Sequence, residues 1–388
     1  MNPLRSSNSV KSAYDSSPIS FENEKKDDLS KREVIKKHLT SFLDAVKRWG
    51  ITITGFLPFS QRWIVLNILL TPLRLLTNRS SIKKIKEKVI GNPHKLNHGI
   101  TDSFVDLESP KHAALRQEVL FKNFHYSAHM YASFGQIEGG ENGELLAGPL
   151  TNLYGVPSNH VQALDLIIYS FTNELGFKVD PFGNFYNLNT GTIFNLVYDK
   201  HSEEVMVCFM GLSSEHFIKI TDAERKKMTS ESLKAAAADF LGGIPPSSRQ
   251  AMDIGRILKE IASTVDMKPV MVGHSHGGGL AQTGAVANGI KGVIFNSRPM
   301  GAGTRRYIGQ STITKNAKYI TAFSGKKDWL SGNKAINFLL ANFEKITGII
   351  VPRTVGKLYQ VPIIPNEPID MQHSGFYQQL QLLKDLFD

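Results

Sequence analysis

One short segment constrains the fold of this chain more than any other, Gly273-His274-Ser275-His276-Gly277. The apolar run Pro269-Val270-Met271-Val272 comes directly before it, and the Gly- and Ala-rich residues 277–281 follow it. In this setting Gly-x-Ser-x-Gly forms a sharp turn between a strand and a helix, which projects the serine hydroxyl from the carboxyl edge of a sheet. The segment therefore predicts Ser275 as a nucleophile; an ordinary glycine-rich turn is the alternative.

Apolar strands alternate with amphipathic helices from residue 181 onward. The pattern predicts strands at 192–198, 204–209, 269–272, 291–295 and 319–323. It predicts helices at 158–175, 247–265, 278–288 and 376–387. Such alternation is typical of a mostly parallel sheet with helices on both faces. We therefore predict an α/β fold of the α/β-hydrolase type at 150–388.

A serine hydroxyl is a weak nucleophile at neutral pH, so Ser275 needs a general base, and the base needs an orienting carboxylate. In folds with this turn the chain order is serine, acid, histidine. Apart from the adjacent His276, His373 is the one histidine downstream of Ser275. We therefore predict His373 as the base, in a loop before the C-terminal helix. A surface histidine in front of a helix is the alternative.

The acid is expected just after a late strand. Asp328 follows the predicted strand at 319–323 and is the first acidic residue after Ser275. Asp370 is its rival, but it lies only three residues before His373, and no clear strand leads into it. We predict Asp328 as the acid; a solvated loop carboxylate beside two lysines is the alternative.

Acyl transfer also needs hydrogen-bond donors for the charge that develops on the carbonyl oxygen. The backbone N–H of His276, directly after the nucleophile, is predicted as one donor. We assign the second to the N–H of Leu212, in the loop after the strand at 204–209, where Gly211 permits a close approach. An ordinary turn at the strand end fits that loop equally well. The side chains of His274 and His276 are interpreted as pocket or packing residues.

Three motifs together resemble the class 3 (fungal-type) lipases. Gly273-His274-Ser275-His276-Gly277-Gly278 is similar to their Gly-His-Ser-Leu-Gly-Gly. Phe209-Met210-Gly211-Leu212 resembles their Phe-Arg-Gly-Thr, and Phe295-Asn296-Ser297-Arg298-Pro299-Met300-Gly301 resembles the segment after the next strand. The resemblance spans about residues 190–380, half of the chain.

This resemblance implies hydrolysis of carboxylic esters of lipids, with Asp328 and His373 standing where the family has its acid and base. It does not indicate which lipid. The chain departs from the family at three positions: Met210 replaces an arginine, Leu212 replaces a threonine, and His276 replaces an apolar residue.

The positive charge of the chain is concentrated near its start. The net charge is +10; residues 1–100 hold 18 Lys and Arg against 8 Asp and Glu, and the remaining residues hold 27 of each. A neutral body with a basic segment suggests an arm that meets an anionic surface. No zinc-finger spacing or basic-aromatic alternation accompanies the charge, so we predict no nucleic-acid partner.

The first part of the chain divides into two predicted regions. Residues 1–29 are polar and predicted to be disordered, and residues 30–130 are predicted to form a basic helical region. Its lysines either lie in solvent on a module packed on the main domain or hold the chain at an anionic membrane surface. Residues 100–150 have no clear pattern.

No apolar targeting segment is visible. The first 30 residues lack the apolar core of a secretory signal, and the apolar run from Trp63 to Leu70 is too short to span a membrane. We expect a cytoplasmic or peripheral membrane protein, or an effector exported without such a signal. The single cysteine, Cys208, excludes a disulfide framework and a Cys-rich metal site, and we predict no cofactor.

Three classes of function stay open on these residues. The first is a lipid acyl hydrolase acting at membranes, with phospholipases among the types that fit. The second is a non-catalytic membrane- or protein-binding protein on a hydrolase scaffold. The third is a hydrolase of soluble esters, thioesters or peptides. Residues 335–351 form an apolar helical stripe that suits either a mobile lid or a core helix, and the insertion at 228–246 is a second lid candidate.

Overall fold

The computed structural model describes most of the second half of the chain. The described residues are 105–133, 143–145, 153–212, 218–240, 242–326, 328, 331, 344, 350, 352–367, 373 and 376–385. The predicted tail at 1–29 and most of the basic region at 30–130 lie outside them. So do Asp370 and most of the lid candidate at 335–351. The membrane role of the basic region therefore stays a prediction.

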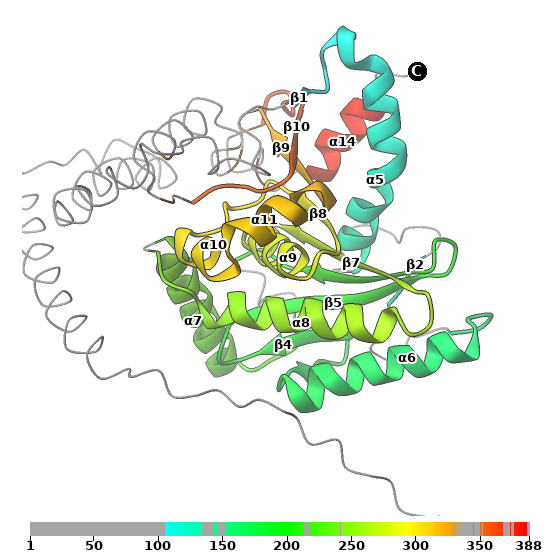
Figure 1. The fold of residues 1–388 in the computed structure, drawn as a ribbon, viewed down its shortest axis with the longest axis vertical. Coiled ribbons are helices and arrows are strands. Elements are labelled where there is room, and N and C mark those ends of the chain that lie inside the picture. The colour runs from blue at the N-terminus through cyan, green and yellow to red at the C-terminus, as the bar shows by residue number, and fades with distance from the viewer. Residues whose placement is uncertain are drawn as a thin grey trace, which may run out of the picture. The chain divides into compact units, whose positions relative to one another are not determined.

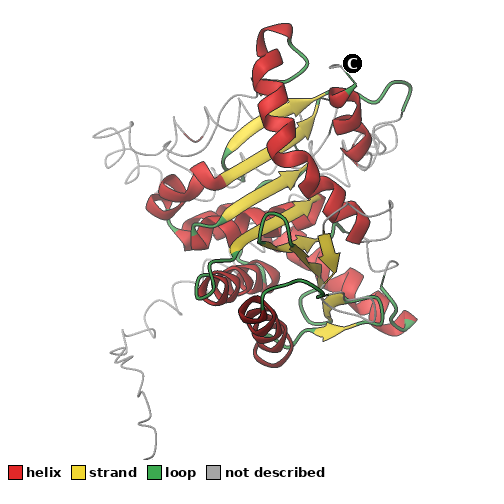
Figure 2. Cartoon of the chain, turned by 90° about the vertical axis from the view of Figure 1, so that its right-hand side faces the viewer, coloured by secondary structure: helices red, strands yellow, loops and turns green. Residues whose placement is uncertain are grey.

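A ten-stranded sheet runs through the described part of the chain (Figures 1 and 2). Its order is β1-β10-β9-β8-β7-β6-β5-β4-β3, and β2 pairs with the second half of β5. Strands from β6 to β1 along this order pair in parallel, while the pairs among β2 to β6 are antiparallel. The strands are β1 (Val105–Asp106), β2 (Gly143–Leu145), β3 (Lys178–Val179), β4 (Asn184–Asn187), β5 (Thr192–Asp199), β6 (Glu204–Phe209), β7 (Lys268–His274), β8 (Lys291–Phe295), β9 (Ile320–Gly325) and β10 (Lys357–Val361).

Helices cover both faces of this sheet (Figure 2). The α5 and α14 helices lie on one face, and α6, α8 and α9 lie on the other, with α10 and α11 beside α9 (Figure 1). The helices are α5 (Ala113–Ser133), α6 (Ser158–Tyr169), α7 (Asp222–Phe240), α8 (Pro246–Ala262), α9 (Ser275–Asn288), α10 (Ala302–Ile308), α11 (Gln310–Asn316) and α14 (Phe376–Lys384), with short turns at Pro110–His112, Ser170–Glu174 and Ala317–Tyr319. The predicted α/β fold is confirmed.

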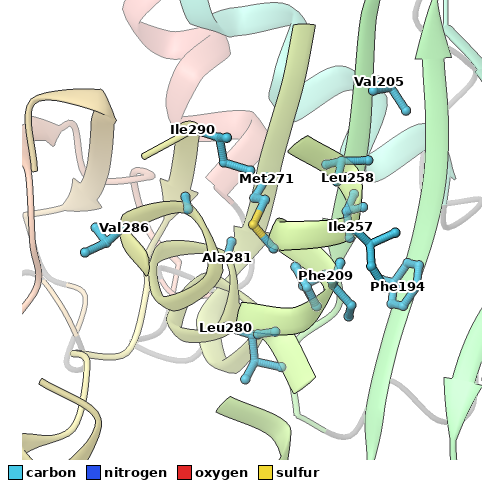
Figure 3. Packing of buried hydrophobic residues seen from close by; sticks show 14 of the residues in the cluster. Phe194, Val205, Phe209, Ile257, Leu258, Met271, Leu280, Ala281, Val286 and Ile290 are labelled. Carbon is cyan, nitrogen blue, oxygen red and sulfur yellow. The ribbon is translucent and has the colours of Figure 1, made fainter. Parts of the chain in front are cut away.

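Side chains of the central strands alternate between two apolar cores, as the period of a strand requires. In β6, Met206 and Cys208 pack on the α5 and α14 face, whereas Val205 and Val207 pack on the α8 and α9 face. Figure 3 shows the second of these cores, where Met271 of β7 lies among residues of α8 and α9. Both faces are apolar because both are buried, so these strands appear in the sequence as continuous apolar runs.

The sheet domain extends further toward the N-terminus than the predicted boundary at 150. Strand β1 pairs with β10, and α5 packs beside α14 on the same face of the sheet. Arg116 of α5 also donates a hydrogen bond to the carbonyl of Leu107 at 3.0 Å. The sheet domain therefore includes the described residues from Val105 onward. Among the described residues, no helix has the length and apolar character needed to cross a membrane.

The lid candidate at 228–246 coincides with most of α7 and the start of α8. Met228 is fully buried, and the Ser232 hydroxyl donates to the carbonyl of Gly191 at 2.9 Å. Gly191 has a φ of +66°, and a Cβ there would lie 2.2 Å from the Ser232 oxygen. This helix is therefore packed closely on the turn between β4 and β5.

Candidate active site

Ser275 occupies a sharp turn between β7 and α9, at the carboxyl edge of the parallel strands. Its φ is 55°, a left-handed conformation that costs free energy in a residue with a side chain. A Cβ at Gly277 would lie 2.3 Å from the carbonyl oxygen of Met210, and one at Gly273 would lie 2.4 Å from that of Gly277. Only glycine fits at these two positions, because the end of β6 and the start of α9 approach the turn closely.

Three side chains that are far apart in the sequence meet at this turn. The Ser275 hydroxyl lies 2.8 Å from Nε2 of His373, and Nδ1 of His373 is hydrogen-bonded to the carboxylate of Asp328. Asp328 is 1% exposed, so it is not the solvated loop carboxylate that was the alternative. An ionised carboxylate only accepts hydrogen bonds, so Nδ1 donates to it, and Nε2 is left to accept from the Ser275 hydroxyl.

The carboxylate of Asp328 divides its two oxygens between two partners. One oxygen accepts from the His373 ring, and the other accepts from the backbone N–H and the hydroxyl of Ser331, at 2.6 and 2.8 Å. The Ser331 hydroxyl lies 2.7 Å from that of Ser324, at the end of β9. These contacts fix the plane of the carboxylate toward the imidazole without burying an unpaired charge.

The backbone of His373 is also held at the sheet edge. Its carbonyl oxygen accepts from Nε2 of His274 at 2.8 Å and from the side-chain amide of Asn296 at 2.9 Å. The side-chain oxygen Oδ1 of Asn296 accepts a hydrogen bond from the N–H of Gly325 at 2.8 Å. Asn296 was not predicted as a site residue, and no such contact was predicted for His274. The available signal was position, since Asn296 directly follows a predicted strand of the parallel sheet.

Two histidines flank Ser275, half-buried His274 and buried His276, and both stay neutral. Burial, with a smaller contribution from His373, lowers the pKa of His274 to about 4. Burial and the neighbouring Arg298 guanidinium lower the pKa of His276 well below its usual range. Both imidazoles therefore act as uncharged hydrogen-bonding groups at neutral pH.

These shifts predict a loss of stability in mild acid. An unfolded histidine takes up a proton near pH 6.5 while folded His274 resists protonation until about pH 4, so protons favour the unfolded chain. The contribution of neutral His274 to the free energy of unfolding is fully present above pH 6.5. We expect this contribution to fall by about 3 kcal/mol as the pH is lowered to 4. Urea unfolding at several pH values measures this. His274→Gln, which keeps a donor for the His373 carbonyl, should flatten the curve; an unchanged curve would contradict the assignment.

The loop after β6 lies against the nucleophile. A Cβ at Gly211 would be 3.3 Å from the Ser275 Cβ, so glycine leaves room beside the hydroxyl. Leu212 follows directly and is half-buried. The N–H of His276 lies in the first turn of α9, where helix N–H groups have no intrahelical acceptor. The roles of Leu212 and His276 as oxyanion donors stay predictions. The described residues contain no cluster of three or more His, Cys, Asp or Glu side chains suited to a metal ion.

The sheet topology and the serine turn give this domain a fold of the α/β-hydrolase type. Residues 193–371 match the family model of the Tle-like phospholipase domain, described as phospholipase-like. The match spans the serine turn and Asp328 and stops just before His373. It covers slightly less than half of the chain. No curated protein matches the chain in sequence.

Several solved structures resemble the chain, and two of them illustrate the identity, coverage and TM-score of that likeness. A mutant form of MDLA from Penicillium cyclopium is 17% identical, with 66% of this chain and 82% of that chain covered and a TM-score of 0.31. A lipase from Yarrowia lipolytica is 13% identical, with 64% and 80% covered and a TM-score of 0.31. These scores are low, so the fold assignment rests on the sheet topology.

Proposed function

We propose that this protein is a serine hydrolase that cleaves carboxylic esters of lipids, with phospholipids as the substrate class. The hydrogen-bonded chain from Ser275 through His373 to buried Asp328 carries the proposal. The phospholipase-like match over residues 193–371 supports the substrate class. In this proposal Ser275 is the nucleophile, His373 the general base and Asp328 the orienting acid.

The geometry fits acyl transfer in two steps. The Ser275 oxygen attacks the ester carbonyl carbon while His373 takes its proton, and the carbonyl oxygen gains negative charge. The N–H groups of His276 and Leu212 are proposed to stabilise that charge. His373 then protonates the departing alcohol, which leaves an acyl-enzyme. A water molecule, deprotonated by His373, attacks the acyl-enzyme, and the carboxylic acid is released as the proton returns to Ser275.

The test uses the full chain and vesicles of a defined phosphatidylcholine and phosphatidylglycerol mixture. We expect release of free fatty acid and lysophospholipid, detected by mass spectrometry, and covalent labelling at Ser275 by a fluorophosphonate. Ser275→Ala, which removes only the hydroxyl oxygen, should abolish both. Release of phosphorylated headgroup or phosphatidic acid would indicate another bond as the target. Absence of both labelling and turnover would favour a non-catalytic scaffold, and turnover of short soluble esters alone would remove the lipid assignment.

A further inference from the structure

A buried arginine in the loop after β8 is hydrogen-bonded to Ser275 and to the residue that follows it. The backbone N–H of Arg298 donates to the carbonyl of Ser275 at 2.9 Å. The Nε–H of its guanidinium donates to Nδ1 of His276 at 3.0 Å. Arg298 is 8% exposed and His276 is 4% exposed, so water does not compete for these bonds. One residue of a neighbouring loop thus fixes two consecutive residues of the turn.

Arg298 is held in turn by Asp239, in the last turn of α7. The guanidinium forms an ion pair with the Asp239 carboxylate, which is 2% exposed. The same carboxylate accepts from the Thr304 hydroxyl at 2.8 Å and from the N–H of Gly301 at 3.2 Å. Three donors from separate residues thus hold the Asp239 carboxylate in place beside the guanidinium. Asp239 therefore sets the direction of the Arg298 fork.

The hydrogen bond from Arg298 also determines which nitrogen of the His276 ring carries the proton. A guanidinium can only donate, so Nδ1 of His276 must accept, and the ring proton lies on Nε2. The ring is neutral, consistent with the lowering of the pKa of His276 by burial and by Arg298. Because Nδ1 is bonded to a fixed donor, the imidazole has one orientation. The Cα and backbone N–H of His276 are restrained together with the ring.

The turn needs such a support because its own sequence provides little. Ser275 has a φ of 55°, and glycines occupy positions 277, 278 and 279 of the first helical turns. Glycine has the greatest backbone freedom of any residue, so three in succession do not hold the turn by themselves. A Cβ at Gly279 would lie 2.7 Å from the guanidinium carbon of Arg298, so the arginine packs directly against this flank of α9.

We propose that the chain Asp239–Arg298–His276 is a positioning device for the backbone N–H of His276, the oxyanion donor of the proposed function. The inference rests on that proposed function, because it assigns the positioned N–H to the transition state. Asp239 and Arg298 do not touch the substrate and act through His276. The device is formed by side chains from α7, the loop after β8 and the turn itself.

The test compares His276→Leu with His276→Asn in the full chain. Asn carries its amide oxygen where the imidazole has Nδ1, so it keeps the acceptor for Arg298, whereas Leu removes the acceptor at similar size. Displacing a catalytic group by about 1 Å can cost on the order of 100-fold in rate. We expect His276→Leu to lower kcat for a short soluble ester about 30-fold, with KM within about 3-fold. His276→Asn should recover most of this loss, with kcat at least about 5-fold above that of His276→Leu.

Arg298→Lys provides a second, independent test. Lysine keeps a positive charge for Asp239 but lacks the planar guanidinium that reaches His276. The variant should lower kcat and the rate of fluorophosphonate labelling together, with the melting temperature close to that of the wild type. Equal losses in His276→Leu and His276→Asn, or wild-type kcat in His276→Leu, would overturn the proposal.

Nitrogen NMR of the His276 ring gives a readout that does not need activity. The wild type should show protonation on Nε2 and a hydrogen-bonded Nδ1, and Arg298→Lys should lose the bonded Nδ1 signal. If the wild type neither labels nor turns over, the proposed function fails, while this spectrum still tests whether the ring is held. A ring protonated on Nδ1 would overturn the positioning device itself.

Discussion

Asp328→Asn is expected to lower kcat for ester hydrolysis by about 10⁴-fold, with little change in fold. An asparagine amide can present its N–H₂ group to Nδ1 of His373, which then becomes an acceptor. The ring proton moves to Nε2, and His373 loses the lone pair that accepts from the Ser275 hydroxyl at 2.8 Å. The loss arises from the wrong tautomer rather than from a displaced ring.

Steady-state kinetics with a short acyl ester measure this effect. Two further variants serve as controls for Asp328→Asn. Asp253→Asn changes an exposed carboxylate on α8 and should behave as wild type. Asp370→Asn changes the rival acid predicted from the sequence. Asp370→Asn should change kcat by less than about 10-fold, since Nδ1 of His373 is already bonded to Asp328. A large loss in that variant with normal turnover in Asp328→Asn would transfer the role of acid to Asp370.

Gly277→Ala is expected to destabilise the protein by more than about 4 kcal/mol or to prevent folding. The new methyl carbon would lie 2.3 and 2.4 Å from the backbone carbonyl oxygens of Met210 and Phe209. These oxygens belong to the end of β6 and the residue after it, in the centre of the sheet, so they cannot move aside as a flexible side chain would. Relief requires a shift of β6 against α9, which disrupts two well-packed surfaces.

Urea unfolding followed by circular dichroism measures this loss, with Gly243→Ala as the matched control. A Cβ at Gly243 would approach its nearest atom, the carbonyl oxygen of Ala238, at 3.1 Å, which a small adjustment can relieve. We expect a cost of about 1 kcal/mol or less there. If Gly277→Ala were as stable as Gly243→Ala, the close approach of strand and helix at the turn would be refuted.

The central elements of the domain around Ser275 could be predicted because their signals are local. The apolar runs at 204–209 and 291–295 coincide with β6 and β8, and the serine motif predicted the turn after β7. Strand β10 was not predicted, and helix α5 was given no bounds of its own, although it overlaps the helical region predicted at 30–130. Lys357–Val361 mixes polar and apolar residues at a parallel position near the sheet edge, and α5 shows no strong apolar periodicity, so neither has a distinct sequence pattern.

The side chains around the turn show the same division. Asp328 and His373 were selected by chain order and position, and the structure brings both to Ser275. Asp239, Asn296 and Arg298 were not selected. In sequence a carboxylate in a helix rich in alanine, or an arginine before a proline, resembles a surface residue. Burial makes them structural, and burial depends on which elements pack together.

The sequence by itself determined the central strands of the sheet, β5 to β9, and the residue at the turn, because apolar periodicity and glycine at a crowded backbone are properties of neighbouring residues. Only the tertiary structure shows that the Asp328 carboxylate contacts the His373 ring and that His274 and Asn296 hold the His373 carbonyl. It alone also shows that Arg298 connects Asp239 to His276. Those contacts join residues from separate elements, and hydrogen bonds of this kind depend on distances of a few tenths of an ångström, which only the packing of the whole domain sets.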